Sequence, residues 1–166
     1  MLQRTINILN SNSFFLFGAR GTGKTTLIES FLSDKPHIKI DLLDERTYES
    51  LSLNIGELDS ILLDAEKNNI EWVAIDEIQK LPKLLDTVHK YIERKKIKFV
   101  LTGSSARKLK RGGANLLAGR AFTYDLFPLT HIELSKIFDL DKAISWGTLP
   151  KSYLSDTDEH RAMFLQ

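Results

Sequence analysis

Residues 14–25 read Phe-Phe-Leu-Phe-Gly-Ala-Arg-Gly-Thr-Gly-Lys-Thr, an apolar run followed directly by a glycine-rich loop. The part from Gly18 to Thr25 fits the pattern G-x-x-x-x-G-K-[ST]. A short apolar run predicts a buried strand, and the residues after the loop favour a helix. A strand, this loop and a helix in that order are the arrangement that phosphate binding requires. The stretch therefore predicts an α/β fold that binds a nucleoside triphosphate.

The loop is expected to hold phosphate groups with its backbone. Gly18, Gly21 and Gly23 can take conformations that a side chain would block, so successive N–H groups can turn inward. A helix starting near Lys24 adds its positive dipole end. Lys24 is expected to reach the β- and γ-phosphates, and the Thr25 hydroxyl to bind Mg²⁺. The alternative is a glycine-rich turn before a helix. The predicted nucleotide-binding residues are Gly18, Ala19, Arg20, Gly21, Thr22, Gly23, Lys24, Thr25 and Thr26.

Bulk composition excludes several classes of protein. The chain has 166 residues, of which 42% are hydrophobic and 27% charged, as in an ordinary globular protein of one domain. It has no cysteine, which excludes disulfides and thiolate zinc sites, and its four histidines show no metal-ligand spacing. The N-terminal apolar run is too short for a signal peptide or a membrane span, so we expect a cytoplasmic location and no membrane partner. The net charge of +1 gives no overall attraction to nucleic acid.

Short apolar runs alternate with amphipathic stretches along the chain, as in α/β proteins with a parallel sheet. The predicted strands are residues 13–17, 37–42, 70–75, 96–102 and 121–126. The predicted helices are residues 24–32 and 57–67, a helix that starts at Pro82, and a helical tail over 130–144. Residues 44–46 are assigned to a solvated loop, and the segment after Trp146 to a loop or boundary. We expect a nucleotide-binding core over residues 1–130 and a helical extension over 131–166.

A second motif ends the third predicted strand, where the apolar residues 72–75 are followed by Asp76-Glu77. Carboxylates at the carboxyl end of a parallel strand project into the crevice where ligands bind. Asp76 is expected to hold Mg²⁺ through water, and Glu77 to orient or deprotonate the attacking water. The alternative is a helix start, which acidic residues also favour. An acid beside the water favours hydrolysis over phosphoryl transfer to a small molecule.

The fourth predicted strand ends in the polar string Thr102-Gly103-Ser104-Ser105. If the strand order is 5-1-4-3-2, this end lies beside the Asp76-Glu77 pair. Thr102 or Ser104 is then placed to contact the γ-phosphate or the attacking water, and the sequence does not decide between them. The alternative is a polar turn that caps the next helix.

These motifs together resemble the AAA+-superfamily ATPases of bacteria and archaea that carry a C-terminal domain of unknown function. The resemblance implies a three-layer P-loop fold of the ASCE type with a five-stranded parallel sheet, ATP and Mg²⁺ as cofactors, and ATP hydrolysis. By matching position it implies catalysis by Glu77 and a transition-state contact or sensor role for Arg120. A guanidinium can stabilise charge on the transferring phosphoryl group, and the alternative is a surface or ion-paired arginine. The matching strings, which cover nearly the whole chain, are Gly18–Thr25, Ala74–Lys80, Leu101–Ser105, Leu117–Arg120, Phe127–Thr130 and Glu133-Leu134.

Members of this family usually continue into further helical and C-terminal domains. We therefore expect the chain to be the ATPase part of a longer protein, or a truncated member, whose nucleotide state drives or switches a partner or an attached domain. The alternative is a nucleotide-binding switch with negligible turnover alone. If Arg120 acts in trans, an oligomer is required, whereas in cis a monomer suffices.

A further hypothesis is a nucleic-acid-associated module. Phosphate-backbone contacts could use two basic clusters, although such clusters are more often solvated helix ends. The clusters are Arg107, Lys108, Lys110 and Arg111, and Arg94, Lys95, Lys96 and Lys98. No guanine-specifying N-K-x-D string occurs in the sequence, which favours ATP over GTP.

Overall fold

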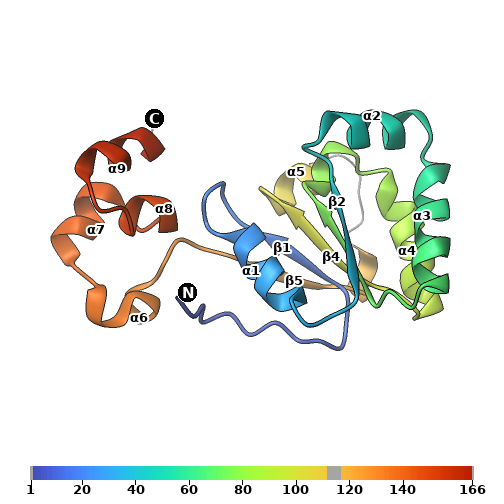
Figure 1. The fold of residues 1–166 in the computed structure, drawn as a ribbon, viewed down its shortest axis with the longest axis horizontal. Helices are drawn as coiled ribbons and strands as arrows, with labels where there is room; N and C mark the ends of the chain where they lie inside the picture. The colour runs from blue at the N-terminus through green and yellow to red at the C-terminus, as the bar shows by residue number, and fades with distance from the viewer. Residues whose placement is uncertain (1, 112–116, 166) are drawn as a thin grey trace.

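The computed structural model describes residues 2–111 and 117–165. Its strands are β1 (Phe14–Phe17), β2 (His37–Asp41), β3 (Trp72–Asp76), β4 (Lys98–Gly103) and β5 (Phe122–Asp125). They form one five-stranded sheet in the order β2-β3-β4-β1-β5, and every neighbouring pair is parallel. Read from the other edge, this is the predicted order 5-1-4-3-2. The predicted three-layer α/β fold is confirmed, because helices lie on both faces of the sheet (Figure 1).

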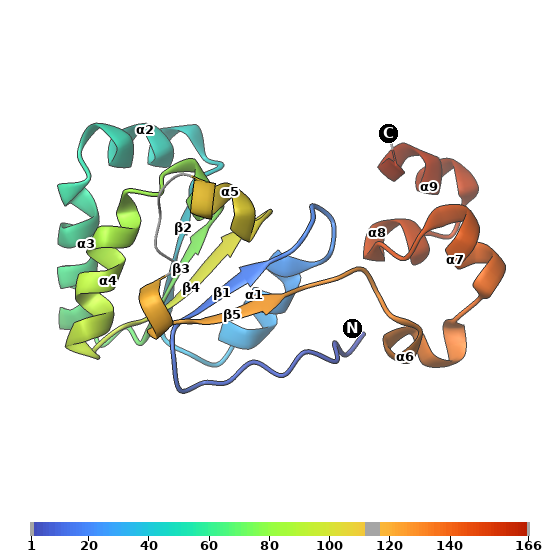
Figure 2. The ribbon, with the colours of Figure 1, turned by 180° about the vertical axis from the view of Figure 1, so that it is seen from behind.

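The two faces of the sheet are covered by different helices. Phe15 and Phe17 of β1 belong to a core cluster with residues of α3 (Gly56–Lys67) and α4 (Leu84–Arg94). Phe14 and Leu16 belong to a second cluster with residues of α1 (Lys24–Leu32). Figure 2 shows α3 and α4 together on one side of the strands, with α1 apart from them. Successive side chains of a strand alternate between the faces, so a strand covered on both faces is apolar throughout.

The helices predicted over residues 24–32 and 57–67 are confirmed by α1 and α3, and the helix predicted from Pro82 begins at Leu84. Short elements follow the ends of two central strands. The 3-10 turn η1 (Ile78–Lys80) comes directly after the acid pair, and α5 (Ala106–Arg111) comes after β4. A second 3-10 turn, η2 (Leu117–Gly119), precedes β5.

The prediction of a loop over residues 44–46 is wrong, because helix α2 (Glu45–Leu53) begins there. The Asp44 carboxylate caps this helix by accepting a hydrogen bond from the Thr47 amide at 2.9 Å. Leu51 is buried in the core and fixes the helix against it. The acidic string after β2 is therefore a helix start, since capping acids stabilise the first turn of a helix.

The C-terminal part consists of short helices rather than the single tail that the sequence predicts. α6 (His131–Leu134) runs into a 3-10 turn, η3 (Ser135–Ile137), before α7 (Leu140–Trp146) begins. Ser135 has a φ of 47°, outside the right-handed helical region, so the helix breaks there. The prediction of a loop or boundary after Trp146 is also wrong, because α8 (Pro150–Tyr153) and α9 (Asp158–Leu165) follow. Pro150 occupies the first turn of α8, where proline is tolerated.

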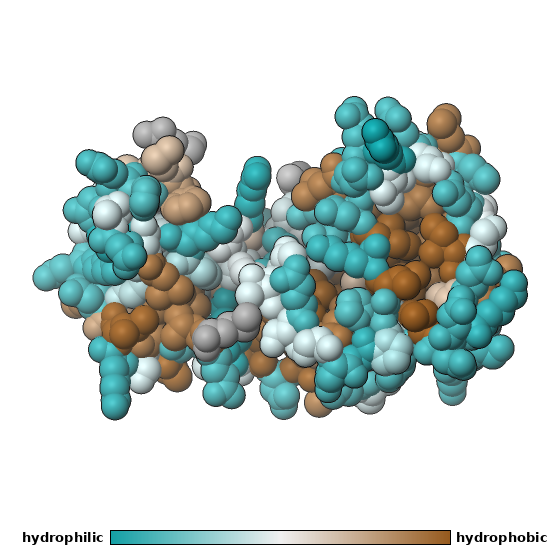
Figure 3. All heavy atoms as spheres, viewed as in Figure 1, coloured by the Kyte–Doolittle hydropathy of each residue, from teal (hydrophilic) through white to brown (hydrophobic). Residues whose placement is uncertain are grey.

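These C-terminal helices lie beyond α1, on the side of the molecule away from α3 and α4 (Figure 1). Leu129, Leu134 and Tyr153 form a small core cluster of their own. Figure 3 shows that the surface is hollowed between this part and the sheet, and that apolar side chains remain exposed over the C-terminal helices. The boundary near residue 130 stays a prediction. Across the described ranges, the helices are too short or too polar to cross a membrane.

Candidate functional site

The loop between β1 and α1 needs glycine at defined positions. Gly21 and Gly23 have φ angles of 84° and 93°, in the left-handed region that favours glycine. A Cβ added at Gly18 would lie 2.4 Å from the carbonyl oxygen of Leu126, which follows β5. The end of β5 therefore passes directly against the loop, and the loop turns tightly from β1 into α1.

The Lys24 side chain lies inside this loop and is 9% exposed. Its Nζ donates hydrogen bonds to the carbonyl oxygens of Gly18 at 2.7 Å and Ala19 at 3.3 Å. Thr22 is fully buried, and its hydroxyl donates to the same Ala19 oxygen at 2.9 Å. The ammonium is thus held inside the loop by two of its carbonyl oxygens. The other loop and helix residues named from the sequence are exposed: Ala19, Arg20, Gly21, Thr25 and Thr26.

The acid pair lies at the carboxyl end of β3, beside the end of β4. The Thr102 hydroxyl on β4 donates to Asp76 Oδ1 and accepts a hydrogen bond from the Glu77 amide at 3.0 Å. Glu77 has a φ of 56°, so the chain turns sharply out of the strand after Asp76. Of the two candidate sensor residues, Thr102 is the one that contacts both members of the acid pair.

Gln79 on η1 connects Glu77 to the other candidate sensor residue. Its amide Nε2 donates to Glu77 Oε2 and lies 3.5 Å from Ser104 Oγ. Gly103 makes room for it, because a Cβ there would lie 2.5 Å from Gln79 Oε1. In the sequence, Gln79 stands out only as part of a string that matches the family. Its contact with β4 depends on β3 and β4 being neighbours, which a local pattern does not record.

A small cavity of about 30 Å³ lies between α1, β2 and β3, and Thr25, Asp76 and Thr102 are among its lining residues. The loop over Gly18–Thr25 is called the phosphate loop below. A hydroxyl and one carboxylate suit Mg²⁺, which keeps several waters and takes other ligands from phosphates. Within residues 2–111 and 117–165, no cluster of three or more His, Asp or Glu side chains could hold a metal. Thr25 and Asp76 thus place one hydroxyl and one carboxylate, both oxygen donors of the kind that Mg²⁺ binds, at the same cavity.

Arg120 lies near the amino-terminal ends of the strands, opposite the ends that carry the loop and the acid pair. The Phe122 amide at the start of β5 donates to the Ser13 carbonyl in front of β1, and β1 and β5 are parallel. The Arg120 guanidinium forms an ion pair with Glu93 at the end of α4. The phosphate loop follows the opposite ends of these strands. The structure therefore does not bring Arg120 to the acid pair of its own chain.

The structure describes lysine side chains in one of the two basic clusters, and leaves most of the other cluster undescribed. Lys96 and Lys98 form ion pairs with Glu66 at 3.6 Å and Glu71 at 2.7 Å. Pairing lowers the free positive charge that these two lysines present to a phosphate backbone. In the other cluster, the side chains of Lys108, Lys110 and Arg111 lie outside the described part of the structure.

A larger pocket of about 510 Å³ opens beside the start of α1. It lies between the N-terminal segment, α1 and the C-terminal helices, and its surface is mostly apolar. Its volume is in the range of small-molecule sites. The pocket shares Gly23 with the phosphate loop, so a ligand with its phosphates on the loop would have its other end beside the pocket. The lining includes Leu2, Arg4, Gly23, Leu27, Leu129 and Leu154.

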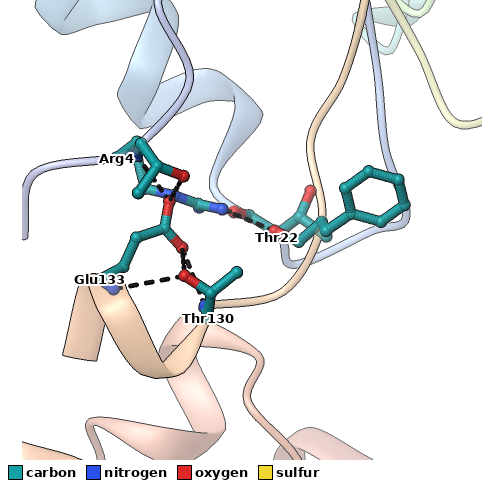
Figure 4. Close-up of polar contacts among 6 residues, drawn as sticks. Arg4, Thr22, Thr130 and Glu133 are labelled. Atoms are coloured by element: carbon teal, nitrogen blue, oxygen red, sulfur yellow. Dashed lines mark hydrogen bonds and ion pairs between the residues drawn. The ribbon is translucent and has the colours of Figure 1, made fainter. Parts of the chain in front are cut away.

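An ion pair between Arg4 and Glu133 joins the N-terminal segment to α6 (Figure 4). Only 11% of the Arg4 side chain and 2% of the Glu133 side chain are exposed. No sequence motif points to Arg4, and Glu133 occurs only as part of a string that matches the family. The two residues are 129 positions apart, and a pattern within one helix or strand cannot link them.

The surroundings of Glu133 predict a loss of stability in acid. Burial alone would raise the pKa of this carboxyl, but the Thr130 and Thr5 amides and the Arg4 guanidinium together lower it from 4.5 to about 2. Because the folded-state pKa is lowered, these contacts stabilise the fold above about pH 4.5 and are lost as the pH falls toward 2, a contribution on the order of 3 kcal/mol. We expect the stability difference between wild type and Glu133→Gln to shrink over this range in urea unfolding. A difference that stays constant from pH 6 to pH 3 would contradict this assignment.

Comparison with known proteins gives one family. A family model described as "AAA domain" matches residues 10–135, which include the phosphate loop, the acid pair and Glu133. No curated protein matches the chain significantly.

Proposed function

Since the chain belongs to the AAA domain family, we propose that it binds ATP with Mg²⁺ and hydrolyses it. The nucleotide would then drive or switch a partner protein or an attached domain. The observation that carries the proposal is that Thr25, which follows Lys24 in the loop, and Asp76, the first residue of the acid pair, line one cavity. The loop follows the carboxyl end of β1 and the acid pair follows that of β3. Open α/β sheets bind ligands at this end of their strands.

The proposal gives each of these residues a separate task. The loop amides and Lys24 hold the β- and γ-phosphates, and Thr25 with Asp76 holds Mg²⁺, which when bound neutralises phosphate charge. Glu77 orients the attacking water and accepts its proton. Thr102 keeps the two acids in place through its hydrogen bonds to Asp76 Oδ1 and the Glu77 amide.

The apolar pocket beside Gly23 would accommodate the nucleoside, which is the other end of the ligand. Its volume of about 510 Å³ suits a base and a ribose, and its lining is mostly apolar. We place the base between α1 and the C-terminal helices. Adenine is favoured over guanine because the sequence lacks the N-K-x-D string that specifies guanine.

Replacing Lys24 with methionine tests nucleotide binding directly. Methionine keeps much of the length of the side chain but removes the ammonium, so the loop loses a charged donor to the phosphates. Loss of one charge-assisted hydrogen bond corresponds to about 10- to 100-fold weaker binding. Isothermal calorimetry with ATP and Mg²⁺ measures the change.

The matched control for this experiment is Lys83→Met, at an exposed position before α4. It is expected to bind ATP as the wild type does. If folded wild-type protein gives no heat with ATP and Mg²⁺, the proposed function fails.

A second candidate is a nucleotide-binding switch with little turnover by one chain. The position of Arg120 favours it. This guanidinium pairs with Glu93 near the amino-terminal ends of the strands, so it does not reach phosphates bound by the loop of its own chain. Arg120 of a second copy, in an oligomer, would then supply the missing charge. ATP binding without phosphate release by the purified chain would favour this candidate over the first.

A further inference from the structure

Arg4 contacts three parts of the chain that lie far apart in the sequence (Figure 4). Its Nη1 donates to the Thr22 carbonyl oxygen at 2.8 Å, its Nη2 to the Phe127 carbonyl oxygen at 2.6 Å, and its Nε to Glu133 Oε1 at 2.9 Å. These acceptors belong to the phosphate loop, to the segment that leaves β5, and to α6. The side chain is largely shielded from water, and hydrogen bonds in such surroundings are stronger than those in solvent.

The contact with Thr22 sets the direction of a loop amide. No cis peptide bond occurs among the described residues, so the Thr22 carbonyl and the Gly23 N–H lie in one peptide plane and point in opposite directions. Because Arg4 holds the carbonyl on its own side, the Gly23 N–H is directed away from Arg4. The Thr22 hydroxyl bonds to Ala19 and holds the same residue from within the loop. Arg4 therefore orients one of the amides that surround a bound phosphate.

The contact with Glu133 goes beyond what α6 needs for capping. In the capping box of α6, Glu133 Oε2 accepts from the Thr130 amide at 2.9 Å, and the Thr130 hydroxyl accepts from the Glu133 amide at 3.3 Å. The other carboxylate oxygen, Oε1, accepts from Arg4 and from the Thr5 amide and hydroxyl at 2.8 and 3.1 Å. A helix cap does not require these bonds to the N-terminal segment. They fix α6 to the residue that also holds the loop.

Arg4 is also part of the wall of the apolar pocket. It lines the pocket together with Gly23 of the loop and with Leu129, Pro150 and Leu154 of the C-terminal part. A Cβ added at Gly23 would lie 3.7 Å from Arg4 Nη1 and 3.8 Å from Pro150 Cγ, so both side chains approach the loop closely. The side chain that bonds to the loop thus also lines the same pocket as the C-terminal part.

We propose that Arg4 is a positioning residue for the phosphate loop and that, through Glu133, it couples nucleotide binding to the seating of the C-terminal helices against α1. A nucleotide that occupies both the loop and the pocket stabilises the seated helices, and the seated helices raise its affinity by the same factor. The inference rests on the proposed nucleotide binding.

The test uses Arg4→Lys, which keeps the charge but offers one ammonium in place of three nitrogens that reach three acceptors. Two quantities are measured: calorimetric affinity for a non-hydrolysable ATP analogue with Mg²⁺, and amide hydrogen exchange over residues 131–154. We expect about tenfold weaker binding of the analogue, as for the loss of about one hydrogen bond. We also expect faster exchange over residues 131–154 without the analogue, and loss of the protection that the analogue confers there. Arg46→Lys, at an exposed position on α2, is the matched control and should behave as the wild type.

Glu133→Gln separates the two halves of the proposal. It removes the charge on α6 but leaves the Arg4 contacts with Thr22 and Phe127 in place. We expect it to weaken binding of the ATP analogue but not of inorganic tripolyphosphate, which occupies the loop alone. Arg4→Lys should weaken binding of both. The double variant should lose less affinity than the product of the two single losses, because the residues act through one contact.

Unchanged exchange over residues 131–154 in both variants would overturn the coupling, even with weaker binding of the analogue. Unchanged affinity in Arg4→Lys would overturn the positioning role. If the wild type binds no analogue, the proposed nucleotide function fails. Exchange measured without the analogue still shows whether Arg4 holds α6 in place.

Discussion

Replacing Glu77 with glutamine is expected to slow ATP hydrolysis by about 10²- to 10⁴-fold while leaving ATP binding nearly unchanged. Glu77 is held at the end of β3 by two contacts, from its amide to Thr102 and from Gln79 to its carboxylate. Glutamine has the same shape but cannot accept a proton from the attacking water. The substitution therefore removes the base and leaves the phosphate and Mg²⁺ ligands in place. Steady-state phosphate release and calorimetry on the same preparation measure the two quantities.

The matched control is Glu49→Gln, the same change at an exposed position on α2. It should hydrolyse ATP at the wild-type rate. Equal rates for Glu77→Gln and the wild type would remove Glu77 from the mechanism. If Glu77→Gln loses ATP binding instead, Glu77 acts on the bound nucleotide or its ion and not as the base.

Gly18→Ala is expected to lower the free energy of unfolding by about 3 kcal/mol. The added Cβ would lie 2.4 Å from the Leu126 carbonyl oxygen and 3.0 Å from Thr22 Oγ1. Since the nearer atom belongs to the backbone, it cannot swing aside as a flexible side chain can. Either the end of β5 or the phosphate loop has to move, so nucleotide binding should weaken in the molecules that still fold. Urea unfolding followed by circular dichroism gives the change in stability.

Gly56→Ala provides the control for that experiment. Gly56 is the first residue of α3, and a Cβ there would meet only Asn54 Oδ1 at 3.1 Å, the end of a flexible side chain. Alanine also has the higher helix propensity, so this variant should be as stable as the wild type or slightly more stable. If Gly18→Ala unfolds at the same urea concentration as the wild type, β5 and the loop can move apart without a loss in the free energy of unfolding. The prediction is then wrong.

Most of the central fold could be predicted because its signals are local. The run from Phe14 to Phe17 has to be apolar throughout in a strand covered on both faces, and the glycine pattern that follows is required by the left-handed angles at Gly21 and Gly23. The same holds for α1, whose predicted limits agree with the structure. Strand limits were less accurate, as for the third strand, predicted over residues 70–75 and observed as Trp72–Asp76.

The errors have a common physical cause. At α2, the sequence predicts a solvated loop where an acid caps a helix, since a capping acid and a surface acid look alike until the Thr47 amide is placed beside Asp44. In the C-terminal part, α8 and α9 are short, and a few residues do not show a helical period. Such helices are stabilised mainly by packing, as Tyr153 shows in its cluster with Leu129 and Leu134.

The phosphate loop, the acid pair and the α/β class follow from local sequence, because each depends on residues within one turn or one strand of one another. The distant residues that join them are set by the tertiary fold. The pairing of β3 with β4 brings Thr102 to Asp76 and Glu77, the parallel run of β5 beside β1 carries Arg120 away from the loop, and the path of the N-terminal segment sets Arg4 against Thr22 and Glu133. Such contacts arise from strand pairing and the packing of separate layers, which no periodicity along the chain encodes.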